Sequence, residues 1–155
     1  MLRGGDRGIM RDEAPVVPLC SSSEAFEIFS GYVEKGLSDF AGQPIEIDYG
    51  NYTHIMEDEE RLERAPWVGP AVGQPDEVWL LSVGSVEKQW RGVRRRTYLK
   101  RFRPSPANLE ELFAVGLEQT ASGKLRLRTC FKVRYPARYV ENLRQQGGEK
   151  IWPSD

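Results

Sequence analysis

The chain has 155 residues, enough for one domain with its own core, and its mean hydropathy of −0.54 describes a polar globular protein. No stretch approaches the roughly 20 apolar residues of a membrane span. Two distant cysteines and one histidine offer too few ligands for a zinc site. The formal net charge of −1 hides two halves: residues 1–83 carry 6 Lys and Arg against 16 Asp and Glu, and residues 84–155 carry 16 against 7. This asymmetry is typical of either a polyanionic partner or a solvated basic surface.

The acidic half is predicted to be mainly helical. Residues 1–20 have little periodicity, and we interpret them as a flexible lead-in or linker before a single domain over residues 21–155. Apolar side chains at spacings of three or four predict a first helix, with Ser22 or Ser23 as its N-cap. A short strand over residues 45–49 follows. A second helix is expected over residues 53–65, where Pro66 ends it, with one short helical turn near residues 67–72.

From Asp76 onward the pattern is that of strands. We expect them over residues 78–83, 94–103, the later part of 109–118, and 124–134, with a hairpin turn at Ser122-Gly123. A helix over residues 137–146 then leads to an edge strand over 149–152. Helices first, then an antiparallel sheet, then one late helix predict an α+β fold.

Two strands are unusually basic. Strict alternation in residues 124–134 puts Thr129 on an apolar face and places five cations and Cys130 on the other. Cations interleaved with aromatic rings are typical of RNA-binding surfaces, because rings stack on bases while Lys and Arg contact phosphates. The alternative is that Tyr98 and Phe102 belong to the core. The predicted RNA-binding residues are Arg95, Arg96, Tyr98, Arg101, Arg126, Arg128 and Lys132.

The only histidine, His54, has two interpretations. It is either a surface residue or a general acid or base, since an ordinary histidine titrates near neutrality. RNA cleavage without a metal needs one group to take the 2′-hydroxyl proton and another to protonate the leaving 5′-oxygen. With no second histidine, the second proton carrier would be a carboxylate, Tyr98, or no group of the usual kind.

Short motifs follow one another along residues 47–152. They are Thr53-His54-Ile55, Pro75-Asp76-Glu77-Val78-Trp79, Arg96-Thr97-Tyr98-Leu99-Lys100, Arg128-Thr129-Cys130-Phe131, and a last group from Tyr139 through Arg144 and Gly147 to Trp152. In order and spacing they resemble the phage branch of the barnase–EndoU–colicin–RelE-like nucleases. Domains of this kind often end phage head morphogenesis proteins or polymorphic toxins.

The resemblance implies a barnase/RelE-like fold, with N-terminal helices packed on an antiparallel sheet of about four strands and a short C-terminal helix. It also implies a metal-independent ribonuclease with no cofactor, whose catalytic residues are His54, Lys100, Thr129 and Arg144. His54 would be the acid or base, Lys100 and Arg144 would bind the scissile phosphate, and Thr129 would donate a hydrogen bond to it. Since alternation puts Thr129 on the apolar face, this role requires a sheet edge or a bulge; otherwise Thr129 is a core residue.

Our leading hypothesis is therefore an endoribonuclease of phage or toxin origin that cleaves RNA by 2′-hydroxyl attack on the phosphodiester. The alternative is a non-catalytic nucleic-acid-binding or phage head accessory module that uses the basic sheet face. RNA is the expected partner, and a cognate inhibitor or a phage head protein are further candidates. We expect no membrane contact and a location in the host cytoplasm or in association with the virion.

Overall fold

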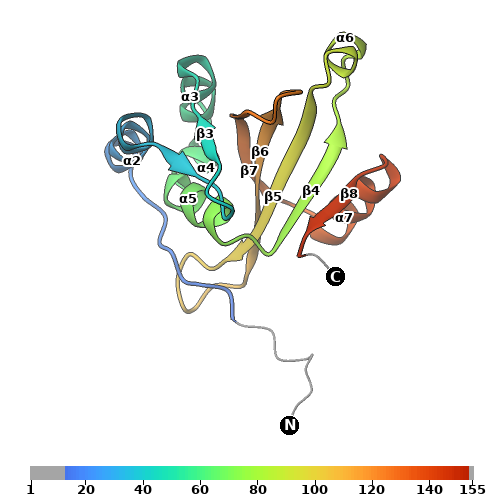
Figure 1. The fold of residues 1–155 in the computed structure, drawn as a ribbon. Coiled ribbons are helices and arrows are strands. Elements are labelled where there is room, and N and C mark those ends of the chain that lie inside the picture. The colour runs from blue at the N-terminus through green and yellow to red at the C-terminus, as the bar shows by residue number, and fades with distance from the viewer. Residues whose placement is uncertain (1–12, 154–155) are drawn as a thin grey trace.

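A seven-stranded sheet forms the centre of the protein in the computed structural model, which describes residues 13–153 (Figure 1). Its strand order is β2-β3-β7-β6-β5-β4-β8. The strands are β2 (Leu37–Ser38), β3 (Pro44–Glu46), β4 (Glu77–Ser82), β5 (Arg94–Phe102), β6 (Glu111–Gln119), β7 (Leu125–Val133) and β8 (Glu149–Trp152). The α+β class is confirmed. The expected count of about four strands is wrong, because three short strands extend the four long ones at both edges, and β3 pairs parallel with β7.

Helix α2 (Ser22–Lys35) begins one residue earlier than predicted. Ser21 is its cap, because the Ser21 side chain accepts a hydrogen bond from the Glu24 amide and the Glu24 carboxylate accepts one from the Ser21 amide at 3.0 Å. This reciprocal pair satisfies two amides that a helix start otherwise leaves free. The helix buries Ala25 and Phe29 only, and its apolar side chains Phe26 and Val33 stay exposed.

The single helix predicted over residues 53–65 is wrong. Two helices occur there instead, α3 (Tyr49–Met56) and α4 (Glu59–Leu62). The short helical turn expected near residues 67–72 is confirmed and is longer than predicted, as α5 (Ala65–Gly73). The side chains of Asp48 and Asp58 each accept a hydrogen bond from a backbone amide, and each thereby caps the start of a new helix. Pro66 lies in the first turn of α5, where its missing amide proton has no cost, so it begins a helix where we expected an end.

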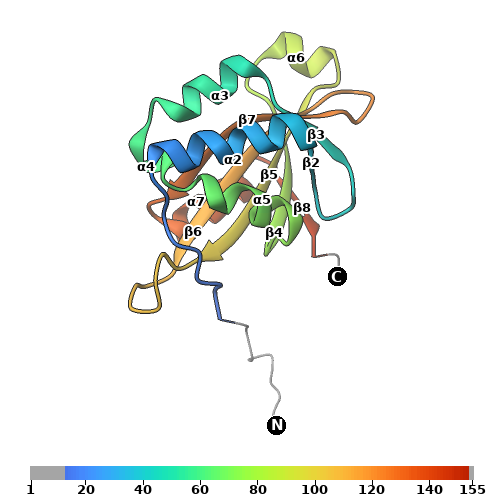
Figure 2. The same ribbon diagram turned by 90° about the vertical axis from the view of Figure 1, so that its left-hand side faces the viewer.

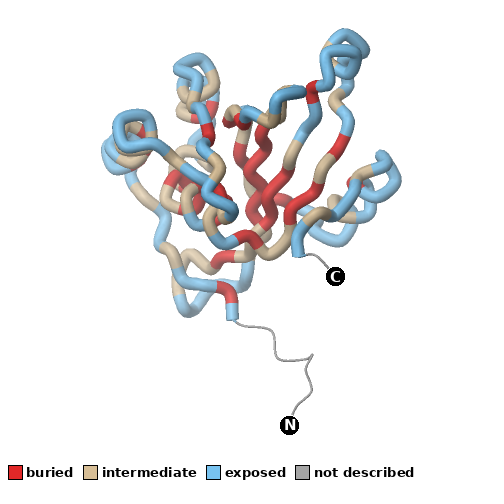
Figure 3. The backbone as a smooth tube through the Cα atoms, in the orientation of Figure 1, coloured by how far each residue is buried: buried red, intermediate tan, exposed pale blue. Residues whose placement is uncertain are grey.

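The two faces of the sheet are covered unequally (Figures 1 and 2). Helices α2, α3 and α5 cover one face, and the largest core lies beneath them (Figure 3). Its fully buried side chains include Phe29, Trp67, Tyr98, Phe102, Phe113, Leu117, Leu125 and Leu127. Helix α7 (Pro136–Gln145) covers part of the opposite face over a smaller core. That core consists of Trp79, Leu81, Leu99, Ala114, Val133 and Leu143. The short helix α6 (Val86–Trp90) lies in the connection from β4 to β5.

A β-bulge in β7 divides that strand into two halves. Leu127 pairs with Leu117 of β6 and Thr129 pairs with Gly116, so Arg128 is an extra residue. Before the bulge, leucines enter the larger core; after it, Cys130 enters that core. Phe131 and Val133 therefore pack on the α7 side, and the uninterrupted alternation predicted for residues 124–134 is wrong.

Part of the predicted lead-in is packed against the domain. The Val17 amide donates to the Arg103 carbonyl at 2.9 Å, and the indole of Trp67 donates to the Val17 carbonyl at 2.8 Å. Ala14 is buried. Residues 1–12 of that segment lie outside the described residues. Within the described part of the chain, no helix has the length and apolar character needed to cross a membrane.

Candidate functional site

Two adjoining hollows lie beside α7 on the partly covered face of the sheet, and they share Phe131, Tyr139 and Asn142. We call them together the α7 groove. The inner part is also lined by Arg95, Thr97, Gly116, Thr129, Leu143 and Gln146. The outer part is also lined by Asp58, Glu60, Arg61, Lys132, Val133, Arg134, Tyr135 and Arg138. The groove thus crosses from the sheet face to the edge of β7, with cations at both ends.

The floor of the inner part is a row of three residues across three strands. Thr97 of β5 and Thr129 of β7 both pair with Gly116 of β6. A Cβ atom at Gly116 would lie 3.1 Å from the Thr129 methyl, so glycine keeps the floor open between the two hydroxyl groups. Arg95 stands on the same face of β5 and donates to the Gln146 side chain at 3.4 Å. The half-buried Thr129 hydroxyl and the exposed Arg95 guanidinium suit a phosphate group, whereas Thr97 is buried.

Tyr139 forms the wall of the inner part opposite the sheet. Its ring packs edge-on against Phe131, with 5.8 Å between ring centroids. Burial raises the pKa of the Tyr139 phenol, while the Arg95 charge and the Thr97 hydroxyl lower it by less. The phenol therefore stays protonated at neutral pH.

At the outer part, Arg61 connects the groove to His54. The Arg61 Nη1 lies 3.3 Å from His54 Nε2. Because a guanidinium only donates, Nε2 is the acceptor in this contact, and the proton of a neutral imidazole is on Nδ1, which lies 3.9 Å from a Glu57 oxygen. His54 is exposed at the border of the groove and contacts it through Arg61.

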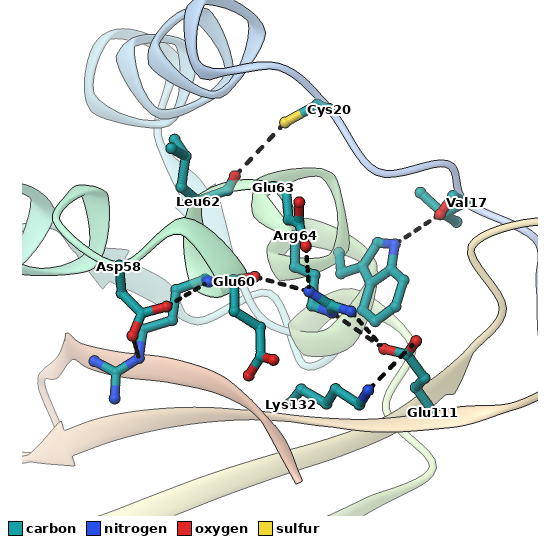
Figure 4. A network of polar contacts seen from close by, with 11 residues as sticks. Val17, Cys20, Asp58, Glu60, Leu62, Glu63, Arg64, Glu111 and Lys132 are labelled. Atoms are coloured by element: carbon teal, nitrogen blue, oxygen red, sulfur yellow. Dashed lines mark hydrogen bonds and ion pairs between the residues drawn. The ribbon is translucent and has the colours of Figure 1, made fainter. Parts of the chain in front are cut away.

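A buried ion-pair network fixes the wall that carries Arg61 (Figure 4). Arg64 is almost fully buried and binds Glu111 of β6 at 2.9 Å and Glu63 at 3.0 Å. Lys132 of β7 lies 3.8 Å from the other Glu111 oxygen. Since both cations meet the same carboxylate, the turn between α4 and α5 is held against the central strands.

The four predicted catalytic residues do not come together. Thr129 lines the groove and His54 lies at its border. Lys100 is on the opposite face of the sheet, where its Nζ donates to the Gln74 carbonyl at 2.6 Å. Arg144 lies outside the groove, 5.8 Å from the centre of the Trp79 ring and 3.7 Å from Glu141.

The predicted RNA-binding residues also divide. Arg95 and Lys132 line the α7 groove. Arg126, Arg128 and Arg101 are in ion pairs with Glu46 at 3.2 Å, Glu118 at 3.7 Å and Asp76 at 3.2 Å, respectively.

The predictions for Tyr98 and Arg96 need correction, because both side chains lie on the face of β5 that the N-terminal helices cover. The Tyr98 ring is fully buried, and its hydroxyl donates to Asp39 at 2.7 Å, so it is unavailable for base stacking. Arg96 lies 3.6 Å from the same Asp39 carboxylate. Because Tyr98 lies in the larger core and not in the groove, it is also removed as the second proton carrier.

Sequence reasoning missed the groove residues Arg61, Thr97, Tyr139 and Asn142. The two on α7 lie three residues apart, as residues on one helix face do, and this spacing was a usable signal.

These features define an α+β domain with an open basic groove beside a C-terminal helix. Residues 23–153 match the family described as phage-Barnase-EndoU-ColicinE5/D-RelE like nuclease2, and the chain belongs to this nuclease family. The resemblance inferred from the motifs is thereby confirmed, over a longer stretch than residues 47–152. No curated protein and no solved structure matches the chain.

Proposed function

We propose that the protein is a metal-independent endoribonuclease that binds RNA in the α7 groove. The observation that carries the proposal is the row of Thr97, Gly116 and Thr129 on the floor of the inner part of the groove, with the exposed Arg95 beside it. Membership in a nuclease family supports phosphodiester cleavage. A single-stranded substrate suits the groove, because Phe131 and Tyr139 offer rings between the cations of its two ends.

The proposed reaction proceeds in one displacement. The 2′-oxygen attacks the adjacent phosphorus and the bond from phosphorus to the 5′-oxygen breaks, leaving a 2′,3′-cyclic phosphate and a 5′-hydroxyl end. One proton leaves the 2′-hydroxyl and one reaches the 5′-oxygen. Thr129 donates a hydrogen bond to a phosphate oxygen, and Arg95 offsets the growing negative charge on the phosphate.

Two groups are suited to the proton transfers. His54 Nε2 becomes available as a base when Arg61 turns from it to a bound phosphate. Tyr139 remains protonated and so serves as the donor to the leaving oxygen. The phage designation of the family supports action on RNA in a host cytoplasm, with a phage head protein or a cognate inhibitor as partner.

A second candidate function is a non-catalytic RNA-binding module. The observation that favours it is the scatter of His54, Lys100, Thr129 and Arg144 over different parts of the molecule. Such a module would use the same cations of the α7 groove and would bind RNA without cleaving it.

Cleavage of total RNA by the purified protein in EDTA tests the proposal. Thr129→Val keeps the shape of the side chain and removes the hydroxyl, and His54→Ala removes the proton carrier. Lys150→Ala is the matched control, because it removes an exposed cation on β8 away from the groove. We expect wild type and Lys150→Ala to cleave and both site variants to lose at least about tenfold in rate, as removal of one positioned donor does.

The other outcomes are equally informative. Cleavage that survives both site variants excludes this site. RNA binding that weakens as salt is raised, with no cleavage by wild type, assigns the protein to the second candidate function.

A further inference from the structure

Helices α2 and α3 form a second groove, on the opposite side of the molecule from α7 (Figures 1 and 2). We call it the α2–α3 groove. It is lined by Phe26, Phe29, Ser30, Val33, Glu34, Ile47, Tyr49 and Tyr52. Phe26 is 57% exposed, Val33 61% and Tyr49 69%. Exposed apolar side chains gathered in one place mark interaction surfaces more often than the single ones that every protein surface carries.

The aromatic residues of this groove hold one another in position. The Tyr52 ring centroid lies 5.4 Å from that of Phe29, 6.3 Å from Phe26 and 6.0 Å from Tyr49. Because Phe29 is fully buried in the core, the exposed rings are anchored and the groove is formed before anything binds. Rigid aromatic side chains on a preformed surface are the typical anchors of protein interfaces.

The stretch of chain that carries α2 and α3 is strongly acidic. Residues 22–60 contain ten Asp and Glu and one basic residue besides His54, which is Lys35. Glu34 lines the groove and Glu27 lies on the same helix. Among residues 13–153, neither of these two carboxylates has an ion-pair partner. An apolar groove with the Glu34 carboxylate in its lining and Glu27 on the same helix attracts a cationic partner and repels the phosphates of RNA.

We propose that the α2–α3 groove binds a segment of another protein that carries apolar side chains flanked by Lys and Arg. A groove between two helices accepts an amphipathic helix, whose side chains at spacings of three and four enter it in a row. The surface is separate from the α7 groove, so a bound partner leaves the RNA site open. The inference goes beyond the nuclease function and stands if that function fails.

Selection from a random library of 14-residue peptides against the wild-type protein tests this directly. We expect enrichment of peptides with apolar residues at helical spacing and Lys or Arg between them. For a synthetic peptide of the enriched sequence, Phe26→Ser should weaken binding at least about tenfold, because the apolar contact area of an aromatic side chain is lost. Glu34→Lys should also weaken peptide binding, through the change of charge alone. Because Glu34 is exposed, this variant should fold normally and keeps the test valid if Phe26→Ser impairs folding.

Two matched controls lie elsewhere on the surface. Leu109→Ser removes an exposed apolar side chain next to β6, and Glu149→Lys reverses an exposed charge on β8. Both should bind the peptide as wild type does, and cleavage or binding of RNA should be unchanged in the Phe26 and Glu34 variants. A library that yields no binder, or one that yields peptides without basic residues, overturns the proposal. A wild-type dimer that Phe26→Ser dissociates in sedimentation assigns the groove to a second copy and overturns it as well.

Discussion

The two faces of the central sheet both carry cations, but the cations are bonded within the protein on one face and exposed on the other. On the face beneath α2, α3 and α5, the cations Arg96 and Lys100 are held by Asp39 and by the Gln74 carbonyl, respectively. On the face beside α7, Arg95 is exposed and makes one long hydrogen bond to a neutral side chain. A cation on a basic strand is therefore free to meet a ligand only where its face is open, and the covering helices determine which of two adjacent arginines is free.

The largest difference between the faces should appear in stability. Trp67 of α5 packs on the face of the sheet that α2, α3 and α5 cover, which we call the closed face. Trp67→Ala removes a fully buried ring stacked 4.7 Å from that of Phe102 and should cost about 3–5 kcal/mol of unfolding free energy. Trp90→Ala is the control, because this tryptophan is almost fully exposed and its loss should change stability by about 0.5 kcal/mol at most. Urea denaturation measures both. Similar losses for the two variants would contradict the assigned core.

The closed face should also make the protein sensitive to alkali. Burial raises the pKa of the Cys130 thiol from 9.0 to about 12. Above pH 9 the unfolded chain releases this proton and the folded chain retains it, so stability is full below pH 9 and falls by about 1.4 kcal/mol per pH unit from there towards pH 12.

Urea denaturation at pH 8, 9, 10 and 11 measures that slope. Cys130→Ala should have a shallower slope than wild type, while Cys20→Ala, whose thiol is only partly buried, should change it less. An identical slope in Cys130→Ala and wild type would show that the thiol titrates normally.

The sharpest test of the comparison is the pair Arg95→Ala and Arg96→Ala. Arg95→Ala should weaken single-stranded RNA binding and lower the slope of log K against log salt by about 1, since one phosphate contact is lost. Arg96→Ala should leave that slope unchanged and cost roughly 1.5–3 kcal/mol of stability, because the buried Asp39 loses a charged partner. Fluorescence anisotropy and urea denaturation separate the two effects, and a reversed pattern would exchange the roles of the faces.

The smallest effect is expected at Arg144. Its guanidinium lies over the Trp79 ring at the exposed surface of α7, so Arg144→Ala should cost about 0.5–1 kcal/mol of stability and leave RNA cleavage unchanged. A tenfold loss of cleavage with intact stability would instead support the role that the family resemblance implied for this residue.

Local signals predicted much of the fold. The hairpin at Ser122-Gly123 was predicted from its residue types, and Gly123 has a φ of +90°, which glycine tolerates well. Pro66 misled the prediction because proline suits the first turn of a helix as well as its end. The two-residue strand β2 has too few residues to show alternation, and its pairing with β3 depends on tertiary contacts.

The candidate site was harder to predict, since its residues come from distant segments. Thr129 was identified from a motif, but its face depended on a bulge that no residue type announces. Arg95 and Arg96 look alike in the sequence, and only the helices packed on β5 distinguish them. Tyr139 and Asn142 belong to the groove because α7 crosses the strands at that point.

Because of the bulge at Arg128, odd-numbered residues of β7 face the larger core before it and the α7 side after it. Deletion of this one residue would remove the bulge, because Leu127 and Thr129 already pair with the consecutive residues Leu117 and Gly116 of β6. Thr129 would stay on the α7 side and Cys130 in the larger core. A single-codon loss at Arg128 should therefore be tolerated better than one in the middle of β5, where every side chain beyond the deletion would change face.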